Sequence, residues 1–269
     1  MNCQGPVSSA TVIRCNAGRR EAAPDHVAVE EPLEIRLGKN RLAVLMRTPG
    51  HDVDLATGFL LTEGLVPHPD DIAGIDYCPN VSDSELGNVL VVLPEAGRVI
   101  VPPQRAFYAS ASCGICGKTG IESVALAAPP ASTATKFDLA TLISLPERLR
   151  QCQTVFDQTG GLHAAGLYAP DGQSLCVRED IGRHNAVDKV IGALAADGRF
   201  PLPDVALLVS GRASFEICQK AAMAGIPLVA SISAPSSLAI ELARRLGMTL
   251  VGFLRGDGCN IYCGEQRLR

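Results

Sequence analysis

The pattern of hydrophobic and polar positions predicts a β-hairpin near the start of the ordered chain. Apolar residues alternate with polar ones over 33–37 and again over 41–47, on either side of a turn at 38–40. Period-two alternation around such a turn is typical of two antiparallel strands. The further elements predicted in this part are a helix over 52–63, with acidic residues in its first turn, and a strand over 88–93.

The pattern changes in the second half, where short apolar runs alternate with amphipathic segments. A capping-box pattern from Ser144 to Glu147 predicts a helix that continues to about residue 157, with Pro146 in its first turn. The elements predicted after it are strands over 163–168 and 174–177, a helix over 185–196, and then strand 205–210, helix 214–224, strand 228–232, helix 236–246 and strand 249–254. Strands that are apolar throughout, separated by amphipathic helices, predict an α/β fold with a mixed, largely parallel sheet and helices on both faces.

These patterns divide the chain into four segments. We expect a flexible tail over 1–28 and a smaller, mainly β region over 29–126 that contains the hairpin and a cysteine-rich loop. A stretch rich in Pro, Ala, Ser and Thr over 127–136 is typical of a linker or surface loop. The α/β domain is then expected over 137–269.

Composition narrows the class of protein. The 269 residues include 24 Lys and Arg against 28 Asp and Glu, which gives a net charge of −4, and only 4% of residues are aromatic. An acidic chain with few stacking side chains does not favour a general nucleic-acid binder. We find no signal-peptide pattern and no apolar run long enough to span a bilayer, so we predict a cytoplasmic protein without membrane contact. Its ten cysteines are then expected to be mostly reduced thiols.

The most informative segment is Ser-Cys-Gly-Ile-Cys-Gly-Lys at 112–118. Cys113 and Cys116 lie three residues apart, so their thiols can meet on one turn, and the glycines let a large partner approach a sulfur closely. A thiolate there could serve redox chemistry, a metal site or sulfur transfer, and the motif alone does not separate these three roles. A zinc site would need two more ligands, for which Cys259 and Cys263 are the nearest candidate pair. Cys152, Cys176 and Cys218 lie in apolar patterns and are interpreted as small buried hydrophobes.

Three polar segments coincide with predicted strand ends. They are Arg178 to Lys189, Ser210 to Ser214, and Phe253 to Gly258. Ligands of open α/β sheets bind at the carboxyl ends of the strands, so these segments together indicate an anion-binding floor. The candidates for the positive charge are Arg212 and Arg255, with Arg178 or Arg183 behind them. The chain has neither a Walker-type loop nor a Gly-x-Gly-x-x-Gly fingerprint, so an ordinary nucleotide enzyme is not indicated.

Several motifs together resemble the FdhD family of sulfur carrier proteins, which formate dehydrogenases require for activity. The motifs are the cysteine segment at 112–118, Thr-Gly-Gly-Leu-His-Ala-Ala at 159–165, Glu-Asp-Ile-Gly-Arg-His-Asn-Ala-Val-Asp-Lys at 179–189, Ser-Gly-Arg-Ala-Ser-Phe-Glu at 210–216, and Phe253 to Gly258. The resemblance covers the chain from about residue 30 to its end. It implies a larger domain similar to cytidine deaminases, although the zinc signature of those enzymes is missing.

The resemblance also implies a chemistry. Cys113 matches the family's persulfide-bearing cysteine and Cys116 its second thiol. The stretch that matches the family's cofactor-binding segment consists of Phe253, Leu254, Arg255, Gly256, Asp257 and Gly258. Such a homodimeric protein takes sulfur from a cysteine desulfurase and passes it to the molybdenum of the bis(molybdopterin guanine dinucleotide) cofactor, for formate dehydrogenase. The alternative function is a non-catalytic chaperone that binds and shields this cofactor.

Overall fold

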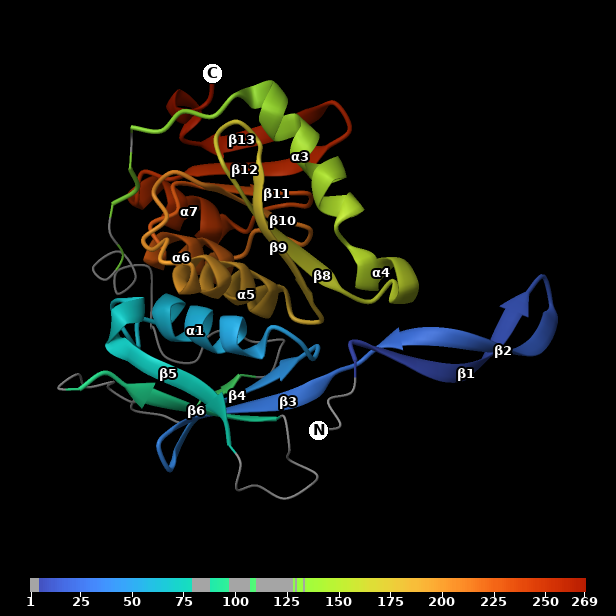
Figure 1. Ribbon diagram of the computed structural model, residues 1–269. Coiled ribbons are helices and arrows are strands. Elements are labelled where there is room, and N and C mark those ends of the chain that lie inside the picture. Colours follow the sequence, from blue (N-terminus) through green and yellow to red (C-terminus); the bar gives the residue numbers. More distant parts are fainter. Residues whose placement is uncertain (1–4, 79–87, 97–106, 110–127, 129, 133) are drawn as a thin grey trace.

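Two β-sheets lie on either side of a central layer of helices (Figure 1). The computed structural model describes residues 5–78, 88–96, 107–109, 128, 130–132 and 134–269. A five-stranded sheet comes from the first part of the chain and a six-stranded sheet from the second, and α3 covers the far face of the larger one. No helix in the described ranges is long and apolar enough to cross a membrane.

The smaller sheet contains the predicted hairpin. Its strands are β3 (Glu31–Leu37), β4 (Asn40–Arg47), β5 (Ile72–Tyr77), β6 (Val89–Pro94) and β7 (Phe107–Ala109), in the order β5-β6-β3-β4-β7. Helix α1 (Asp52–Thr62) lies on this sheet, and a single turn of 3-10 helix, η1 (Pro69–Asp71), precedes β5. Leu33, Ile35 and Leu90 of the strands form one apolar cluster with Leu55 and Leu60 of the helix. The hairpin, the helix and the 88–93 strand are therefore confirmed.

The larger sheet is mixed, and the prediction that it is largely parallel is wrong. Its strands are β8 (His163–Tyr168), β9 (Ser174–Asp180), β10 (Ala206–Val209), β11 (Leu228–Ser231), β12 (Thr249–Arg255) and β13 (Gly258–Cys263), in the order β13-β12-β11-β10-β8-β9. Only the β10–β11 and β11–β12 pairs are parallel. The β8–β9 and β12–β13 pairs are joined by short turns, which connect antiparallel strands, and β8 also runs antiparallel to β10.

Helices cover both faces of the larger sheet, as the sequence predicts. They are α3 (Leu139–Gln151), α4 (Thr154–Thr159), α5 (Arg183–Ala196), α6 (Phe215–Met223) and α7 (Ser237–Arg245), and a 3-10 turn, η2 (Glu265–Arg267), follows β13. Successive side chains of β10 point to opposite faces of the sheet. Ala206 and Leu208 pack in the cluster with α3, whereas Leu207 and Val209 pack in the cluster with α5, α6 and α7.

The start of α3 differs from the prediction. The helix begins after Asp138, whose carboxylate accepts a hydrogen bond of 2.7 Å from the Thr141 N–H, so the expected capping box at 144–147 is wrong. Pro146 lies inside the helix, where it removes a backbone hydrogen bond. Leu142, Leu145 and Leu149 on the same helix are fully buried against the sheet, and their burial offsets that loss.

Most of the expected tail is a β-hairpin. Strands β1 (Val7–Asn16) and β2 (Arg19–Ala28) pair along their whole length and project from the body of the molecule (Figure 1). Ala17 and Gly18 at the turn both have positive φ, which is the conformation of a tight hairpin turn. The sequence signal is weak because this ribbon buries little apolar surface: Ile13 is 63% exposed.

Helices α1 and α5 join the two sheets through a contact that only glycine permits. A Cβ atom on Gly58 of α1 would lie 1.9 Å from the Asp188 carbonyl oxygen of α5. In the same way, a Cβ atom on Gly192 of α5 would lie 1.9 Å from the Asp54 carbonyl oxygen of α1. The two backbones therefore touch directly, without side chains between them.

We expect Gly192→Ala to destabilise the protein by at least about 2 kcal/mol, because its methyl group would force two helix backbones apart. Urea unfolding would measure this. Gly74→Ala is the matched control, since its Cβ would meet only an ordinary contact at 3.7 Å, and it should change stability by less than about 0.5 kcal/mol. Equal stability of the two variants would contradict the direct helix contact.

Candidate functional site at the carboxyl edge of the large sheet

The predicted cofactor-binding stretch lies at the carboxyl end of β12 and in the turn to β13. Phe253 has a φ of 51°, which a non-glycine residue rarely adopts, and its N–H donates a 3.0 Å hydrogen bond to the Ser233 carbonyl. The Arg255 guanidinium lies 5.4 Å from the centre of the Phe253 ring. Leu254 points into the core, while Arg255 and the residues over 256–258 are exposed.

The loops at this edge are tied to one another by short hydrogen bonds. Ser210, after β10, donates its N–H to the Ala164 carbonyl and accepts the Ala164 N–H through its hydroxyl, both at 2.9 Å. Ser231 Oγ lies 2.7 Å from the Gly211 carbonyl oxygen and accepts a 3.1 Å hydrogen bond from the Ser233 N–H. Together with the Phe253–Ser233 bond, these contacts link β8, β10, β11 and β12. Ser231 and Ser233 are not among the residues that the sequence motifs indicate, because their only signal is a serine directly at or after an apolar strand.

A group of basic side chains gathers at the β8 and β10 end of the edge. His163 begins β8, Arg183 and His184 begin α5, and Gly211 follows β10. A Cβ atom on Gly211 would lie 3.3 Å from His163 Nδ1 and 3.8 Å from Arg183 Cδ, so these residues surround one point. Burial, together with the neighbouring Arg183 guanidinium and His184 ring, lowers the pKa of His163.

His184 is held on its other side by helix α6. Its Nε2 atom lies 3.5 Å from Ser214 Oγ and 3.8 Å from Glu216 Oε2. The imidazole beside Glu216 lowers the pKa of that carboxyl to about 2, against a usual value of 4.5. Glu216 is therefore ionised at neutral pH.

The other charged residues of the 178–189 motif form contacts within the protein that stabilise the fold. Arg178 donates to the Asp54 carboxylate of α1 at 3.1 Å, so it does not face the edge. Glu179 accepts the first N–H groups of α4, from Val155 and Phe156, at 2.9 and 2.8 Å. Four arginines are predicted to bind an anion. Arg178 is not available for this role, whereas Arg183, Arg212 and Arg255 lie at or near the sheet edge.

Two buried lysines, Lys189 and Lys220, form ion pairs that also stabilise the fold. Lys189 Nζ lies 2.7 Å from Asp180 Oδ2 and donates to the Thr48 carbonyl at 2.9 Å. Lys220 Nζ, in α6, lies 2.9 Å from the Asp188 carboxylate, and that carboxylate also accepts a 2.8 Å bond from the Thr62 hydroxyl. The ion pairs connect α5 to β9 and to α6, and the Thr62 hydrogen bond connects α5 to α1. They explain why this motif is charged although it is buried.

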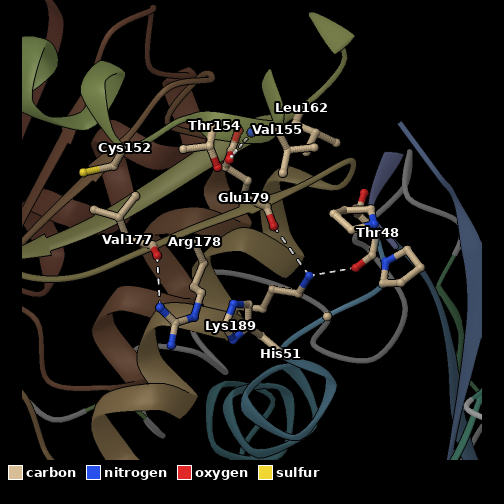
Figure 2. A pocket seen from close by; sticks show the side chains of 13 residues that line it. Thr48, His51, Cys152, Thr154, Val155, Leu162, Val177, Arg178, Glu179 and Lys189 are labelled. Carbon is tan, nitrogen blue, oxygen red and sulfur yellow. Dashed lines mark hydrogen bonds between the residues drawn. The ribbon is translucent and has the colours of Figure 1, made fainter. Parts of the chain in front are cut away.

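A pocket of about 340 Å³ lies between the loop after β4, the segment that joins α3 to α4, and strand β9 (Figure 2). Its lining includes none of the residues over 253–258. Lys189 lies at its centre with its ammonium directed to the backbone carbonyls of Thr48 and Glu179 (Figure 2). Arg178 lines it too and donates to the Val177 carbonyl (Figure 2). Because the charged groups of this pocket are bonded within the protein, it offers less to a ligand than the sheet edge does.

The expected catalytic cysteines, Cys113 and Cys116, lie outside the described residues. Among the described cysteines, Cys176 and Cys218 are buried, as predicted, and burial raises the pKa of Cys218 to about 12. Cys152 is exposed, so its interpretation as a buried hydrophobe is wrong: it follows the last turn of α3, beyond the apolar face. High thiol pKa values suppress thiolate formation, so the buried cysteines are poor nucleophiles.

The structure argues against the zinc site suggested by Cys259 and Cys263. Cys259 packs in the cluster with α3, whereas Cys263 packs in the cluster on the opposite face of the sheet. Two thiolates on opposite faces cannot share one tetrahedral ion. No group of three or more potential ligands is found in the part of the chain that the structure describes.

Comparisons with known proteins agree on one family. The model of the FdhD/NarQ family matches residues 28–269. The sulfur carrier protein FdhD of Streptomyces avermitilis is 48% identical over 268 residues, covering 96% of this chain and 94% of the relative. That of Mycolicibacterium paratuberculosis is 51% identical over 267 residues, with 96% and 97% covered. The crystal structure of a protein described as a formate dehydrogenase accessory protein from Desulfotalea psychrophila matches with a TM-score of 0.76 at 27% identity, covering 98% of each chain.

We expect the Glu216 carboxylate to make stability depend on pH. A carboxyl whose pKa is lowered on folding stabilises the protein above its unfolded pKa, near 4.5, and loses this effect as the pH falls toward about 2. Glu216→Gln should therefore be less stable than wild type by about 1 kcal/mol at pH 6, and the difference should shrink below pH 4.5. Urea unfolding between pH 3 and 7 would measure this, with the exposed Glu241→Gln as control. A difference that does not depend on pH would contradict the ion pair.

Proposed function

The chain belongs to the FdhD/NarQ family, and on that basis we propose that it is a sulfurtransferase that supplies sulfur for formate dehydrogenase. The observation that carries the proposal is the similarity to sulfur carrier proteins along 96% of the chain, together with the Cys113 and Cys116 pair in a glycine-containing sequence motif. Among the described cysteines, Cys176 and Cys218 are buried, and burial raises the pKa of both thiols.

The first step is the acceptance of sulfur from a cysteine desulfurase. The Cys113 thiolate attacks the terminal sulfur of the persulfide on the desulfurase, a sulfur–sulfur bond forms on Cys113, and the donor cysteine leaves as a thiolate. No net oxidation occurs, because one sulfur–sulfur bond replaces another. Lys118 adds a positive charge two residues from Cys116, which favours the thiolate form, and the neighbouring glycines carry no side chains that would hinder a partner.

The second step is the release of sulfur, for which Cys116 is the candidate. Its thiolate attacks Cys113 Sγ, a Cys113–Cys116 disulfide forms, and the terminal sulfur leaves as hydrosulfide. The two electrons come from the two cysteines, so a cellular dithiol must reduce the disulfide before the next cycle. The hydrosulfide is then the sulfur that reaches the molybdenum.

The client is the bis(molybdopterin guanine dinucleotide) cofactor, which is a substrate here. Its diphosphates need positive charge and hydrogen-bond donors, and its rings need an accessible surface. The sheet edge fits these needs, since Arg212 and Arg255 are exposed there and the backbone over 256–258 is open. The unusual backbone of Phe253, fixed by Ser233, gives this stretch a defined shape.

Three further properties remain predictions of the family resemblance. They are a homodimer, a cytoplasmic location and a relationship of the larger domain to the cytidine deaminase fold. The mixed sheet with helices on both faces is compatible with the last of these.

We expect wild-type protein incubated with a cysteine desulfurase and cysteine to gain the mass of one sulfur atom. Cys113→Ala should lose this adduct, because the accepting thiolate is gone, whereas Cys152→Ala should keep it although Cys152 is exposed. Intact-mass spectrometry before and after treatment with a thiol reductant would measure it. An adduct that survives Cys113→Ala would show that the assignment of Cys113 is wrong.

Formate dehydrogenase activity in cells distinguishes the two alternative functions, a sulfur carrier and a non-catalytic cofactor-binding chaperone. In cells that lack the endogenous protein, a carrier with Cys113→Ala should restore less than about 1% of the wild-type activity, since no sulfur is transferred. A cofactor-binding chaperone would instead keep its effect in this variant. Cys152→Ala again serves as the control, and immunoblots would verify equal amounts of protein.

A further inference from the structure

The β1–β2 ribbon has two outer edges, and the two differ in how well they are protected against pairing. The strands form a sheet of their own, so each has one edge that no strand of the described residues pairs with. The base of the ribbon packs against α4, whereas residues 13–22 are all exposed and stand clear of the body (Figure 1). A two-stranded ribbon is only marginally stable in water by itself. A further strand on one edge would therefore stabilise it.

The register of the hairpin shows which backbone groups face outward. Thr11 pairs with Pro24, which has no N–H, so this pair is one of those without hydrogen bonds between β1 and β2. The His26 N–H, two residues further along β2, agrees with this, since it donates to the Asp25 carboxylate at 3.0 Å and not to β1. Bonded and non-bonded pairs alternate along an antiparallel ladder. The backbone groups of the odd-numbered residues of β1, from 7 to 15, therefore face away from β2.

The outer edge of β2 is protected. Pro24 removes a hydrogen-bond donor from the middle of this edge, and the strand carries four charged side chains, those of Arg19, Arg20, Glu21 and Asp25. Proline and charged residues are the means by which natural sheets keep an edge strand from pairing with another chain. Pairing at the β2 edge is therefore disfavoured.

The outer edge of β1 has neither form of protection. The strand is ten residues long, contains no proline and has a single charged side chain, Arg14. It is rich in β-branched residues, and one of them, Ile13, is 63% exposed. A long and nearly uncharged edge strand pairs readily with other strands. The difference between the two edges thus indicates that a specific strand occupies the β1 edge.

A second copy of β1 fits this edge. Two identical strands can pair antiparallel about a two-fold axis, and such a contact closes as a dimer. In a register centred on Thr11, the outward-facing residues of the two copies lie opposite one another and form about ten hydrogen bonds, as many as a typical protein interface has. Each Arg14 lies three residues from the axis, so the two guanidinium groups are about 20 Å apart along the ladder and hardly repel each other.

We propose that two copies of this chain dimerise through their ribbons, with β1 of each copy antiparallel to β1 of the other in a four-stranded sheet centred on Thr11. The inference rests on the homodimer among the properties proposed above and assigns a surface to it. It does not depend on sulfur transfer, because the backbone edge of β1 and its lack of charge carry it.

Thr11→Pro tests the β1 edge. It removes an outward N–H at the proposed axis, while the β1–β2 ladder loses no hydrogen bond. Size-exclusion chromatography with light scattering should give the full-length wild type twice the 28.2 kDa mass of one chain in the micromolar range, and Thr11→Pro the mass of a single chain. His26→Pro is the matched control: it places a proline on the outer edge of β2, and it should remain dimeric.

Three results of this experiment would overturn the proposal. They are a wild type that is monomeric throughout the micromolar range, a dimer that persists in Thr11→Pro, and loss of the dimer in both proline variants. The last result would mean that the β1 edge is not what distinguishes the two variants.

Crosslinking tests the register. In a hydrogen-bonded antiparallel pair, opposite Cα atoms are about 5.5 Å apart, which a disulfide can bridge. Oxidation with copper phenanthroline should therefore link Thr11→Cys into a covalent dimer on a non-reducing gel. Wild type sets the background from the other cysteines, since its Cys15 lies four residues from the axis and thus about 27 Å from the second Cys15. His26→Cys should not exceed this background. Equal crosslinking of Thr11→Cys and His26→Cys would contradict the register.

The dimer and the sulfur carrier function can fail separately. The mass measurement detects the persulfide on Cys113 whatever the oligomeric state, and light scattering detects the dimer without any sulfur donor. A monomeric wild type that still gains the mass of one sulfur atom would overturn only the dimer. A dimer without the adduct would overturn only the proposed function.

Discussion

The direct contact between α1 and α5 is the constraint on which the rest of the structure depends. Gly58 and Gly192 let the two backbones touch, and the Asp188 carboxylate of α5 binds both the Thr62 hydroxyl of α1 and Lys220 of α6 beside this contact. Because α1 covers the small sheet and α5 covers the large one, this single interface fixes the position of one sheet relative to the other (Figure 1). It also fixes where α5 begins, and so where Arg183 meets the sheet edge.

The charged motif that includes residues 178–189 has two roles that alternate along the chain. Arg178 and Asp188 face α1 or α6 and hold the helices together. Arg183 and His184 lie at the start of the helix and face the edge. The proposed ligand site is therefore supported by the same element that joins the two sheets, and this rigid support keeps basic groups close together although they repel one another.

Sulfur transfer requires different properties of the reacting thiols and of the site that binds the cofactor. The attacking thiol must be accessible and ionised, whereas the cofactor needs a surface of fixed shape and positive potential. The loops at the carboxyl edge meet the second demand, because Ser210, Ser231 and Ser233 tie four strands together. The buried cysteines meet neither demand, and they contribute to the core as small apolar side chains.

The sequence by itself determined most helices and strands of the α/β domain, since their apolar periodicities are strong. That Cys113 and Cys116 are the reactive pair stays a prediction from the sequence. It missed the β1–β2 hairpin, which has little apolar patterning to signal it, and placed the start of α3 too late, because Ser144 and Glu147 imitate a cap. Only the tertiary structure decided that the large sheet is mixed and that Arg178 is structural while Arg183 faces the edge. The physical reason is that periodicity reports which face of an element is buried, whereas strand order and ion-pair partners depend on residues more than 100 positions apart, such as Asp54 and Arg178.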